Sequence, residues 1–278
     1  MSNILIPIDF SETSLNAIEH SFLISSLYRA QINLLYVIES ESPFFHFVNQ
    51  SELQELINRV EKRLEELKSK TEKKTGLKAD YIIRKGKVVD NILEVAQELD
   101  IDLLIMGTTG SSDIRKKIIG TNALRVIKEA TFPVLTIKKN VKTRKYKKIV
   151  LPLDLTKQTT QKVKHAIRFA KFFNASIHLV SIITSDNYII NDTLVFKLEQ
   201  TRRKIEAENI ECDTKIEYES NSTSKVANKI LQFCYDISAD LIMIMTQQEA
   251  GIKKFFLGSL ASEIVNKAEL PVLSINPK

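Results

Sequence analysis

Short runs of apolar residues alternate along this chain with longer stretches whose apolar residues recur at helical spacing. Apolar runs in the first half predict β-strands at residues 3–8, 32–38, 79–84, 102–106 and 132–137. Several of these runs are apolar at every position, which is typical of strands buried on both faces of a sheet. The intervening stretches predict amphipathic helices, one of them with apolar residues at Ala123, Val126, Ile127 and Ala130. Strict alternation of strand and helix predicts parallel pairing through right-handed crossovers, and hence a doubly wound α/β domain.

The second half of the chain repeats the first. The segment ILIPID at residues 4–9 recurs as IVLPLD at residues 149–154, and Gly120 recurs as Gly258. Strands are accordingly expected at residues 148–153, 176–183, 212–218, 240–245 and 271–275. Self-similarity of this kind predicts a tandem duplication, with one domain at residues 1–140 and a second at residues 146–278. The basic stretch at 138–148 is expected to be a solvated linker rather than a nucleic-acid patch, because no recognised DNA-binding motif accompanies it.

Composition narrows the class of protein. The chain has 278 residues, of which 44% are hydrophobic and 27% charged, as in soluble globular proteins. No apolar run reaches the roughly 18–20 residues that cross a bilayer, and the N-terminus lacks the basic region of a signal peptide. We therefore expect a cytoplasmic protein that uses neither a membrane nor a nucleic acid as partner. The cysteines, Cys212 and Cys234, are too few for a disulfide framework or a zinc site and are expected to be free thiols.

The candidate chemistry lies at the carboxyl ends of the predicted strands, where ligands bind open parallel sheets. Asp9 follows the first strand and Gly107 follows the fourth. From Gly107 the spacing is Gly-x2-Gly-x9-Gly, with Gly110 and Gly120 as the later glycines, and a helix is predicted to begin after Gly120. Glycine lets a backbone approach a phosphate closely, and a helix N-terminus offers unpaired N–H groups and a positive dipole. The pattern favours phosphate binding, although three ordinary turn glycines would have the same spacing.

The polar residues beside these glycines also have two interpretations. The Asp9 carboxylate either contacts a bound nucleoside or accepts hydrogen bonds from the turn before the first helix, where Ser11 is the expected N-cap. In the same way, Thr121 and Asn122 either cap the helix that follows Gly120 or contact phosphate oxygens.

Together these residues resemble the ATP-binding branch of the universal stress protein family. The resemblance covers essentially the whole chain as two family domains, and includes the segments IPIDFS at residues 6–11 and LYVI at residues 35–38. It implies two five-stranded parallel sheets of the adenine nucleotide alpha hydrolase-like type, each with the strand order 3-2-1-4-5. It also implies ATP, ADP or AMP as the ligand, with Mg²⁺ or Mn²⁺ beside the phosphates. Carried over by position, the implied nucleotide contacts are Pro7, Ile8, Asp9, Val37, Met106, Gly107, Gly110, Gly120, Thr121 and Asn122.

The second half departs from this pattern after its fourth strand. The sequence Thr246-Gln247-Gln248-Glu249 replaces both loop glycines, although Asp154 and Gly258 remain. Side chains would then face the phosphate position, where the carboxylate of Glu249 would repel an anion. We expect the second pocket to be empty or to hold a different ligand.

Other candidate residues give weaker indications. The histidines show neither metal-ligand spacing nor an evident Ser–His–carboxylate arrangement; they are His20, His46, His165 and His178. A cluster after the second strand predicts either a packed loop or an exposed partner surface; it consists of Phe44, Phe45 and Phe47. The basic residues inside the glycine spacer either attract phosphate or are simply solvated; they are Arg115, Lys116 and Lys117.

The function that these features favour is nucleotide-responsive regulation through a protein partner whose identity is open. The chain has no GKS or GKT triplet of a Walker-type loop and no evident general base. Slow ATP hydrolysis or self-phosphorylation is an alternative, with Thr108, Thr109, Ser111 or Thr121 as the acceptor. A scaffold that binds no nucleotide is another. The resemblance further implies internal pairing of the fifth strands, residues 132–137 with residues 270–275, and leaves a homodimer of the whole chain open.

Overall fold

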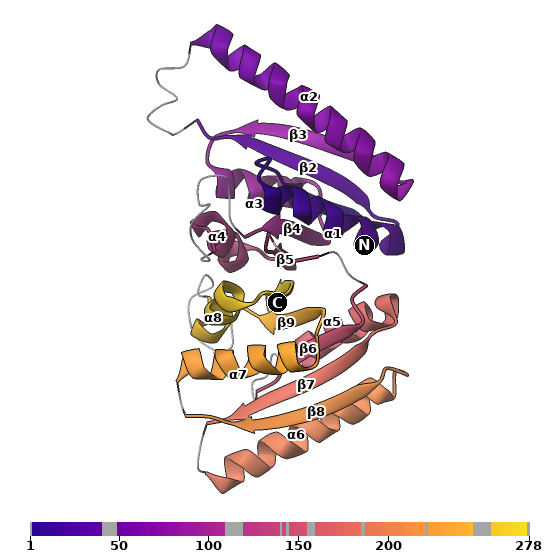
Figure 1. The fold of residues 1–278 in the computed structure, drawn as a ribbon, viewed down its shortest axis with the longest axis vertical. Coiled ribbons are helices and arrows are strands. Elements are labelled where there is room, and N and C mark those ends of the chain that lie inside the picture. The colour runs from indigo at the N-terminus through magenta and orange to yellow at the C-terminus, as the bar shows by residue number, and fades with distance from the viewer. Residues whose placement is uncertain are drawn as a thin grey trace. The chain divides into compact units, whose positions relative to one another are not determined.

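The protein is an α/β chain built from two tandem domains. The computed structural model describes residues 2–40, 49–108, 119–139, 141–142, 145–154, 159–184, 187–220, 222–246 and 257–276. The chain divides into two compact units, the first formed largely by the residues before Asn140 and the second largely by those from Asn140 onward. Strands and helices follow one another in the same order in both units (Figure 1).

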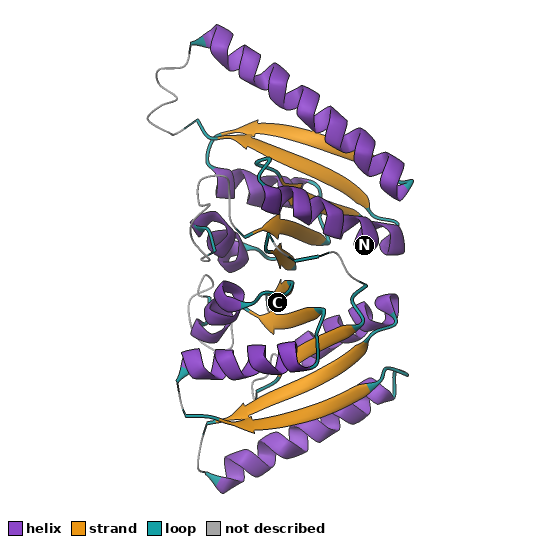
Figure 2. Ribbon diagram, viewed as in Figure 1, coloured by secondary structure: helices purple, strands orange, loops and turns teal. Residues whose placement is uncertain are grey.

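In the first unit, helices lie on both sides of a parallel sheet (Figure 2). Its strands are β1 (Asn3–Pro7), β2 (Gln31–Ile38), β3 (Ala79–Lys85), β4 (Leu103–Gly107) and β5 (Val134–Ile137). Its helices are α1 (Glu12–Tyr28), α2 (Gln50–Thr75), α3 (Val88–Glu98) and α4 (Thr121–Glu129). The strands pair in parallel in the order β3-β2-β1-β4-β5, which confirms the predicted topology.

The second unit repeats this arrangement. Its strands are β6 (Lys148–Pro152), β7 (Ser176–Ile183), β8 (Cys212–Tyr218), β9 (Leu241–Met245) and β10 (Val272–Ile275). Its helices are α5 (Thr159–Phe173), α6 (Tyr188–Glu206), α7 (Thr223–Asp236) and α8 (Ser259–Lys267). The sheet is parallel in the order β8-β7-β6-β9-β10, so the duplication predicted from sequence is confirmed.

The continuous apolar runs form the buried strands that the pattern predicts. Ile4, Leu5 and Ile6 on β1 are each 0% exposed, although successive side chains of a strand point to opposite faces. Both faces of the first sheet are therefore covered: α1 packs against α2, and α3 packs against α4. Burial of each such side chain favours folding by roughly 1.5–3 kcal/mol, so the central strands stabilise the unit strongly.

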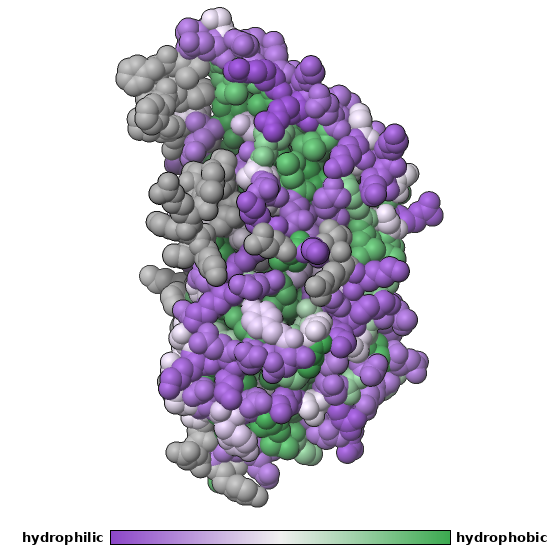
Figure 3. Space-filling model, viewed as in Figure 1, coloured by the Kyte–Doolittle hydropathy of each residue, from purple (hydrophilic) through white to green (hydrophobic). Residues whose placement is uncertain are grey.

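The long charged helix α2 shows how local sequence sets the ends of an element. The Asn49 side chain accepts from the backbone of Glu52, whose carboxylate accepts from the Asn49 N–H in return. Gly76 ends the helix in the left-handed conformation with φ 68°, which confirms the predicted C-cap. The helix buries few of its residues, and Figure 3 shows its outer surface as mainly hydrophilic. Within the described ranges, no helix is both long enough and apolar enough to span a bilayer.

The basic stretch at residues 138–148 is only in part a solvated linker. Tyr146 is 1% exposed and packs edge-on against Phe173, with 5.1 Å between the ring centroids. The backbone N–H groups of Lys147 and Lys148 donate to Asp240 Oδ2 at 2.9 and 3.1 Å. These contacts hold the start of β6 within the second unit, so the stretch is no longer a linker from Tyr146 onward, although Lys147 and Lys148 are exposed, as expected of solvated residues.

Candidate functional site

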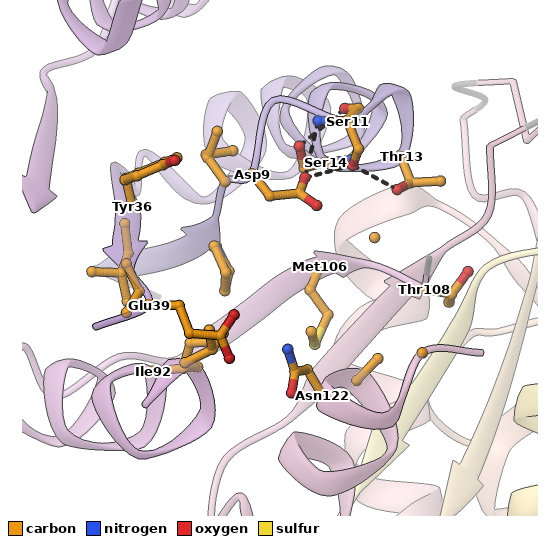
Figure 4. A pocket seen from close by; sticks show the side chains of 18 of the residues that line it. Asp9, Ser11, Thr13, Ser14, Tyr36, Glu39, Ile92, Met106, Thr108 and Asn122 are labelled. Carbon is orange, nitrogen blue, oxygen red and sulfur yellow. Dashed lines mark hydrogen bonds between the residues drawn. The ribbon is translucent and has the colours of Figure 1, made fainter. Parts of the chain in front are cut away.

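A cavity of about 370 Å³ opens at the carboxyl ends of β1, β2 and β4 in the first unit (Figure 4). The winding of the sheet reverses here, because β1 pairs with β2 on one side and with β4 on the other. The starts of α1, α3 and α4 complete its walls. Every predicted site residue that the structure describes lines this cavity: Pro7, Ile8, Asp9, Val37, Met106, Gly107, Gly120, Thr121 and Asn122. The one other predicted residue, Gly110, lies outside the described residues.

The N-terminus of α4 faces the cavity without a side-chain cap at its N-cap position, Gly120. The Gly120 N–H donates to the Thr108 carbonyl at 2.6 Å, which holds the start of α4 against the end of β4. Thr121, Asn122 and Ala123 form the first turn and line the cavity. The first N–H groups of a helix have no partner within it, and they lie at the positive end of its dipole. This wall is therefore suited to an anion such as a phosphate.

The two described motif glycines serve different purposes. A β-carbon on Gly107 would lie 2.7 Å from Thr13 Cβ and 2.8 Å from the Thr13 carbonyl carbon, so α1 can pack here only against glycine. A β-carbon on Gly120 would lie 3.4 Å from the Thr108 carbonyl oxygen, which is an ordinary contact. Neither residue has a positive φ: Gly107 is the last residue of β4 and Gly120 is the N-cap of α4, so a left-handed backbone is not what requires glycine at either position. Gly107 allows a helix to pack closely, whereas Gly120 leaves space at the cavity wall.

The Asp9 carboxylate accepts hydrogen bonds in the turn before α1, as one of its two interpretations predicts, and it also lines the cavity. Its Oδ1 atom accepts from the Ser11 N–H at 3.0 Å and from the Ser11 hydroxyl at 2.5 Å. The Ser11 hydroxyl in turn lies 3.0 Å from Thr13 Oγ1 and accepts from the Ser14 N–H at 3.3 Å, which confirms Ser11 as the N-cap. Figure 4 shows the Asp9 carboxylate directed toward the interior of the cavity. The two roles predicted as alternatives are therefore compatible.

An aromatic pair that sequence reasoning missed, Phe10 and Tyr36, lies beside Asp9. Tyr36 lines the cavity, and its ring lies 5.3 Å from that of Phe10. The Arg63 guanidinium of α2 lies 3.7 Å from the centroid of the Phe10 ring, within the range of a cation–π interaction. Burial raises the pKa of Tyr36, the negative charge of Asp9 raises it further, and the positive charge of Arg63 opposes both. The Tyr36 phenol is consequently a neutral hydrogen-bond donor at physiological pH.

A second carboxylate that sequence reasoning missed is Glu39, just beyond the end of β2. Figure 4 shows it reaching into the cavity, as Asp9 does from the end of β1. The signal was present in the sequence, since a polar residue directly after a buried strand lies at the ligand-binding edge of a parallel sheet. Beside the carboxylates, Ile8, Val37 and Ile92 supply apolar surface. Within the described lining there is no lysine, arginine or histidine.

The histidines give one result that contradicts the sequence-based expectation. His178 Nδ1 lies 2.8 Å from Asp213 Oδ1, and His178 Nε2 lies 2.8 Å from Ser176 Oγ, so a Ser–His–carboxylate chain does exist. It begins at the first residue of β7, at the opposite edge of its sheet from the strand ends where ligands bind. In the first unit, Asn33 and Asp80 hold the paired positions of His178 and Asp213. We therefore interpret this chain as a polar bridge between neighbouring strands, a long-range pairing that local sequence does not reveal.

The remaining candidate residues are fully buried, partly buried (His165) or outside the described residues. His20 is 1% exposed, and within the described ranges no three or more His, Cys, Asp or Glu residues are grouped to hold a metal ion. Several predicted candidates lie outside the described residues: Phe44, Phe45, His46, Phe47, Thr109, Ser111, Arg115, Lys116, Lys117, Gln247, Gln248 and Glu249.

Comparison with known proteins gives the same result for both halves. The model of the universal stress protein family matches residues 1–138 and again residues 145–276. A curated universal stress protein of Methanocaldococcus jannaschii is 34% identical over 147 residues, which covers 49% of this chain and 81% of that protein. A second one from the same organism is 30% identical over 153 residues, covering 49% of this chain and 94% of that protein. The crystal structure of a universal stress protein from Archaeoglobus fulgidus DSM 4304 shares the fold, with a TM-score of 0.80 and 21% identity over 99% of this chain and 96% of that one.

Proposed function

Because the chain belongs to the universal stress protein family, we propose that its first unit binds ATP or a related adenine nucleotide in the cavity at the ends of β1, β2 and β4. This proposal rests on one observation: residues that are far apart in the sequence line a single cavity. Asp9, Val37, Met106 and Gly120 come from separate stretches of the chain, yet all line the same cavity. Its volume of about 370 Å³ is within the range of small-molecule sites.

The apolar and the acidic residues of the cavity suit different parts of a nucleotide, which favours one orientation of the bound molecule. Ile8, Val37 and Ile92 offer apolar surface for the base. The carboxylates of Asp9 and Glu39 accept hydrogen bonds, which suits the ribose hydroxyls and the amino group of adenine. The same carboxylates would repel phosphate groups, so the phosphates belong at the other wall.

The phosphate wall is the N-terminus of α4. Backbone N–H groups, the Thr121 hydroxyl and the Asn122 amide are available there. Mg²⁺ and Mn²⁺ prefer oxygen ligands, and the phosphates with the oxygens of Thr121 and Asn122 provide a suitable set. Such an ion would offset the charge of the phosphates and thereby favour binding of the metal–nucleotide complex.

The site supports binding in preference to rapid turnover. The described lining holds no cationic side chain that would stabilise a transferring phosphoryl group. Among the described acceptor candidates, Thr108 is only 3% exposed, whereas Thr121 is exposed. The proposed role is that of a cytoplasmic stress-response regulator, in which the nucleotide fixes the glycine-containing segment after Gly107 and a protein partner recognises the result.

Calorimetric titration of the intact chain with Mg-ATP, ADP, AMP and GTP tests the site. The expected result is about one adenine nucleotide per chain and weaker binding of GTP. Absence of binding to a chain shown to be folded by circular dichroism would refute it. Hydrogen exchange over residues 107–121 tests the regulatory part, because saturating ATP should slow it. Exchange that does not change on binding would leave a nucleotide site without the proposed readout.

Two assembly features belong to the same proposal. Internal pairing of the fifth strands, β5 with β10, is what resemblance to the family implies, and it would cover one edge of each sheet. A homodimer of the whole chain is tested by light scattering, where a mass near 31.7 kDa indicates a monomer and twice that mass a dimer.

A further inference from the structure

Lys162 in the first turn of α5 is a lysine with almost no contact with solvent. It is 2% exposed and ranks among the largest fully buried side chains. Lysine is almost never fully buried unless its ammonium group is paired. Burial lowers the pKa of Lys162, and the negative charge of Asp154 opposes that effect. A specific arrangement must therefore accommodate this side chain.

The Lys162 ammonium lies at the strand end that corresponds to the nucleotide cavity of the first unit. Its Nζ atom donates to the Pro152 carbonyl at 2.5 Å. Pro152 is the last residue of β6, as Pro7 is the last residue of β1. Pro7 and Asp9 line the cavity in the first unit, and their counterparts Pro152 and Asp154 are the groups that act on Lys162.

The first unit has an alanine at the position that corresponds to Lys162. The repeat keeps one register from the Pro7–Pro152 pair through the His20–His165 pair, and this register places Lys162 opposite Ala17. Ala17 is 0% exposed, so the same position on the helix points into the core in both units. Side chains of a helix lean toward its N-terminus, which directs a long side chain from this position toward the end of the central strand.

A second difference between the two units lies at the end of the fourth strand. The last residue of the fourth strand is Gly107 in β4 and Met245 in β9, so Met245 takes the place of Gly107, and the expectation that Thr246 does so is wrong. Met245 is 1% exposed. One backbone contact beyond it is shared by the two units: the Gly258 N–H donates to the Thr246 carbonyl at 2.8 Å, as the Gly120 N–H does to the Thr108 carbonyl. This contact is thus preserved, while the side chains of Lys162 and Met245 occupy the strand ends.

We propose that the second unit contains a site for a primary ammonium group, formed by the Pro152 carbonyl at the end of β6 with Asp154 as a nearby counter-charge, which Lys162 fills from within the chain and thereby closes this copy to nucleotide. A cation beside an open phosphate site would attract anions. This ammonium cannot do so, because it is buried and engaged by the strand end. The ammonium site itself does not rest on nucleotide binding by the first unit.

Chemical rescue tests the site. Lys162→Ala restores the alanine of the first unit and removes the atoms that propylammonium carries. We expect its thermal midpoint to fall by roughly 10 °C and to recover saturably with propylammonium, but not with tetramethylammonium at equal ionic strength. Lys164→Ala, at an exposed position on the same helix, is the matched control and should show neither effect. If Lys162→Ala does not fold unaided, the yield of refolding in propylammonium is the same readout.

Lys162→Met distinguishes a lysine whose ammonium group stabilises the fold from one that is buried at a net cost in stability. Methionine fills the volume but leaves the Asp154 charge and the Pro152 carbonyl without the cation, so this variant should also be less stable than the wild type. A Lys162→Met chain more stable than the wild type, or a Lys162→Ala chain that propylammonium does not rescue, would overturn the ammonium site. ATP stoichiometry tests the closure separately: two nucleotides per chain would overturn it, whereas none would refute the proposed function and leave the rescue result standing.

Discussion

Gly107 and Thr13 are so close that a β-carbon on the glycine would lie 2.7 Å from the threonine β-carbon. This contact joins the first turn of α1 to the end of β4, and it lies at the wall of the cavity. A glycine of the motif therefore has a packing role of its own. Loss of nucleotide binding after substitution at Gly107 would not by itself identify a phosphate contact.

Gly107→Ala should destabilise the first unit by about 2 kcal/mol, because the added methyl group overlaps a backbone atom of α1 as well as a side chain. Urea unfolding measures the loss. Gly120→Ala is the control, since its β-carbon would make only an ordinary contact with the Thr108 carbonyl. The control should change the free energy of unfolding by no more than about 1 kcal/mol. Equal losses in the two variants would contradict the packing role of Gly107.

The two roles of Asp9 can be separated by substitution. Asp9→Asn retains a side-chain oxygen that accepts from Ser11 but removes the charge that faces the cavity, so ATP affinity should fall about tenfold with little change in stability. Ser11→Ala removes the N-cap of α1 and should cost about 1 kcal/mol of stability while affinity is kept. Calorimetric titration and urea unfolding of both variants provide the measurements. The opposite assignment of effects would show that Asp9 is only a turn carboxylate.

The cysteines should be unreactive in the folded chain. Burial raises the pKa of both Cys212 and Cys234 to about 12, from an ordinary value of 9.0. At pH 8 a thiol of that pKa is almost wholly protonated, so its reaction with a disulfide reagent should be limited by unfolding. Fast labelling of either thiol without denaturant would contradict this burial.

The same shift makes stability depend on alkaline pH. In the unfolded chain the thiols ionise near pH 9, whereas in the folded chain they stay protonated until about pH 12. The folded state then binds more protons over this interval, so the free energy of unfolding should fall as pH rises from about 9 to about 12. A Cys212→Ser, Cys234→Ser chain should show a shallower decline when both are measured by urea unfolding.

Sequence pattern was sufficient for the fold because its signals are local. The unbroken apolar run from Ile4 to Ile6 predicts a strand covered on both faces, and Gly76 ends α2 in the conformation expected of a C-cap. Every strand end lies within two residues of its prediction, and the small differences arise where hydrogen bonding rather than hydropathy decides. The candidate site was found for a related reason, since strand ends in a parallel sheet share one edge.

Other features depend on pairings that no local pattern contains. The contact of His178 with Asp213 requires the register of β7 against β8, which joins residues far apart in sequence. Lys162 looks like an ordinary charged residue of an amphipathic helix, and only its alignment with Ala17 indicates that it points into the core. Glu39 differs from these two, because its position directly after the buried strand β2 does indicate a place at the ligand-binding edge.

The central claim is that one copy of a duplicated site binds nucleotide, and a matched pair of valine substitutions tests it most directly. Gly120 and Gly258 both precede a helix, and a β-carbon on either would lie 3.4 Å from the carbonyl oxygen of Thr108 or Thr246. Gly120→Val and Gly258→Val should therefore affect folding alike, and only the first fills the proposed phosphate wall. Calorimetric titration with Mg-ATP should give about one site per chain in the wild type and in Gly258→Val, and at least tenfold weaker binding in Gly120→Val. Equal behaviour of the two variants, or no binding by the folded wild type, would contradict the account.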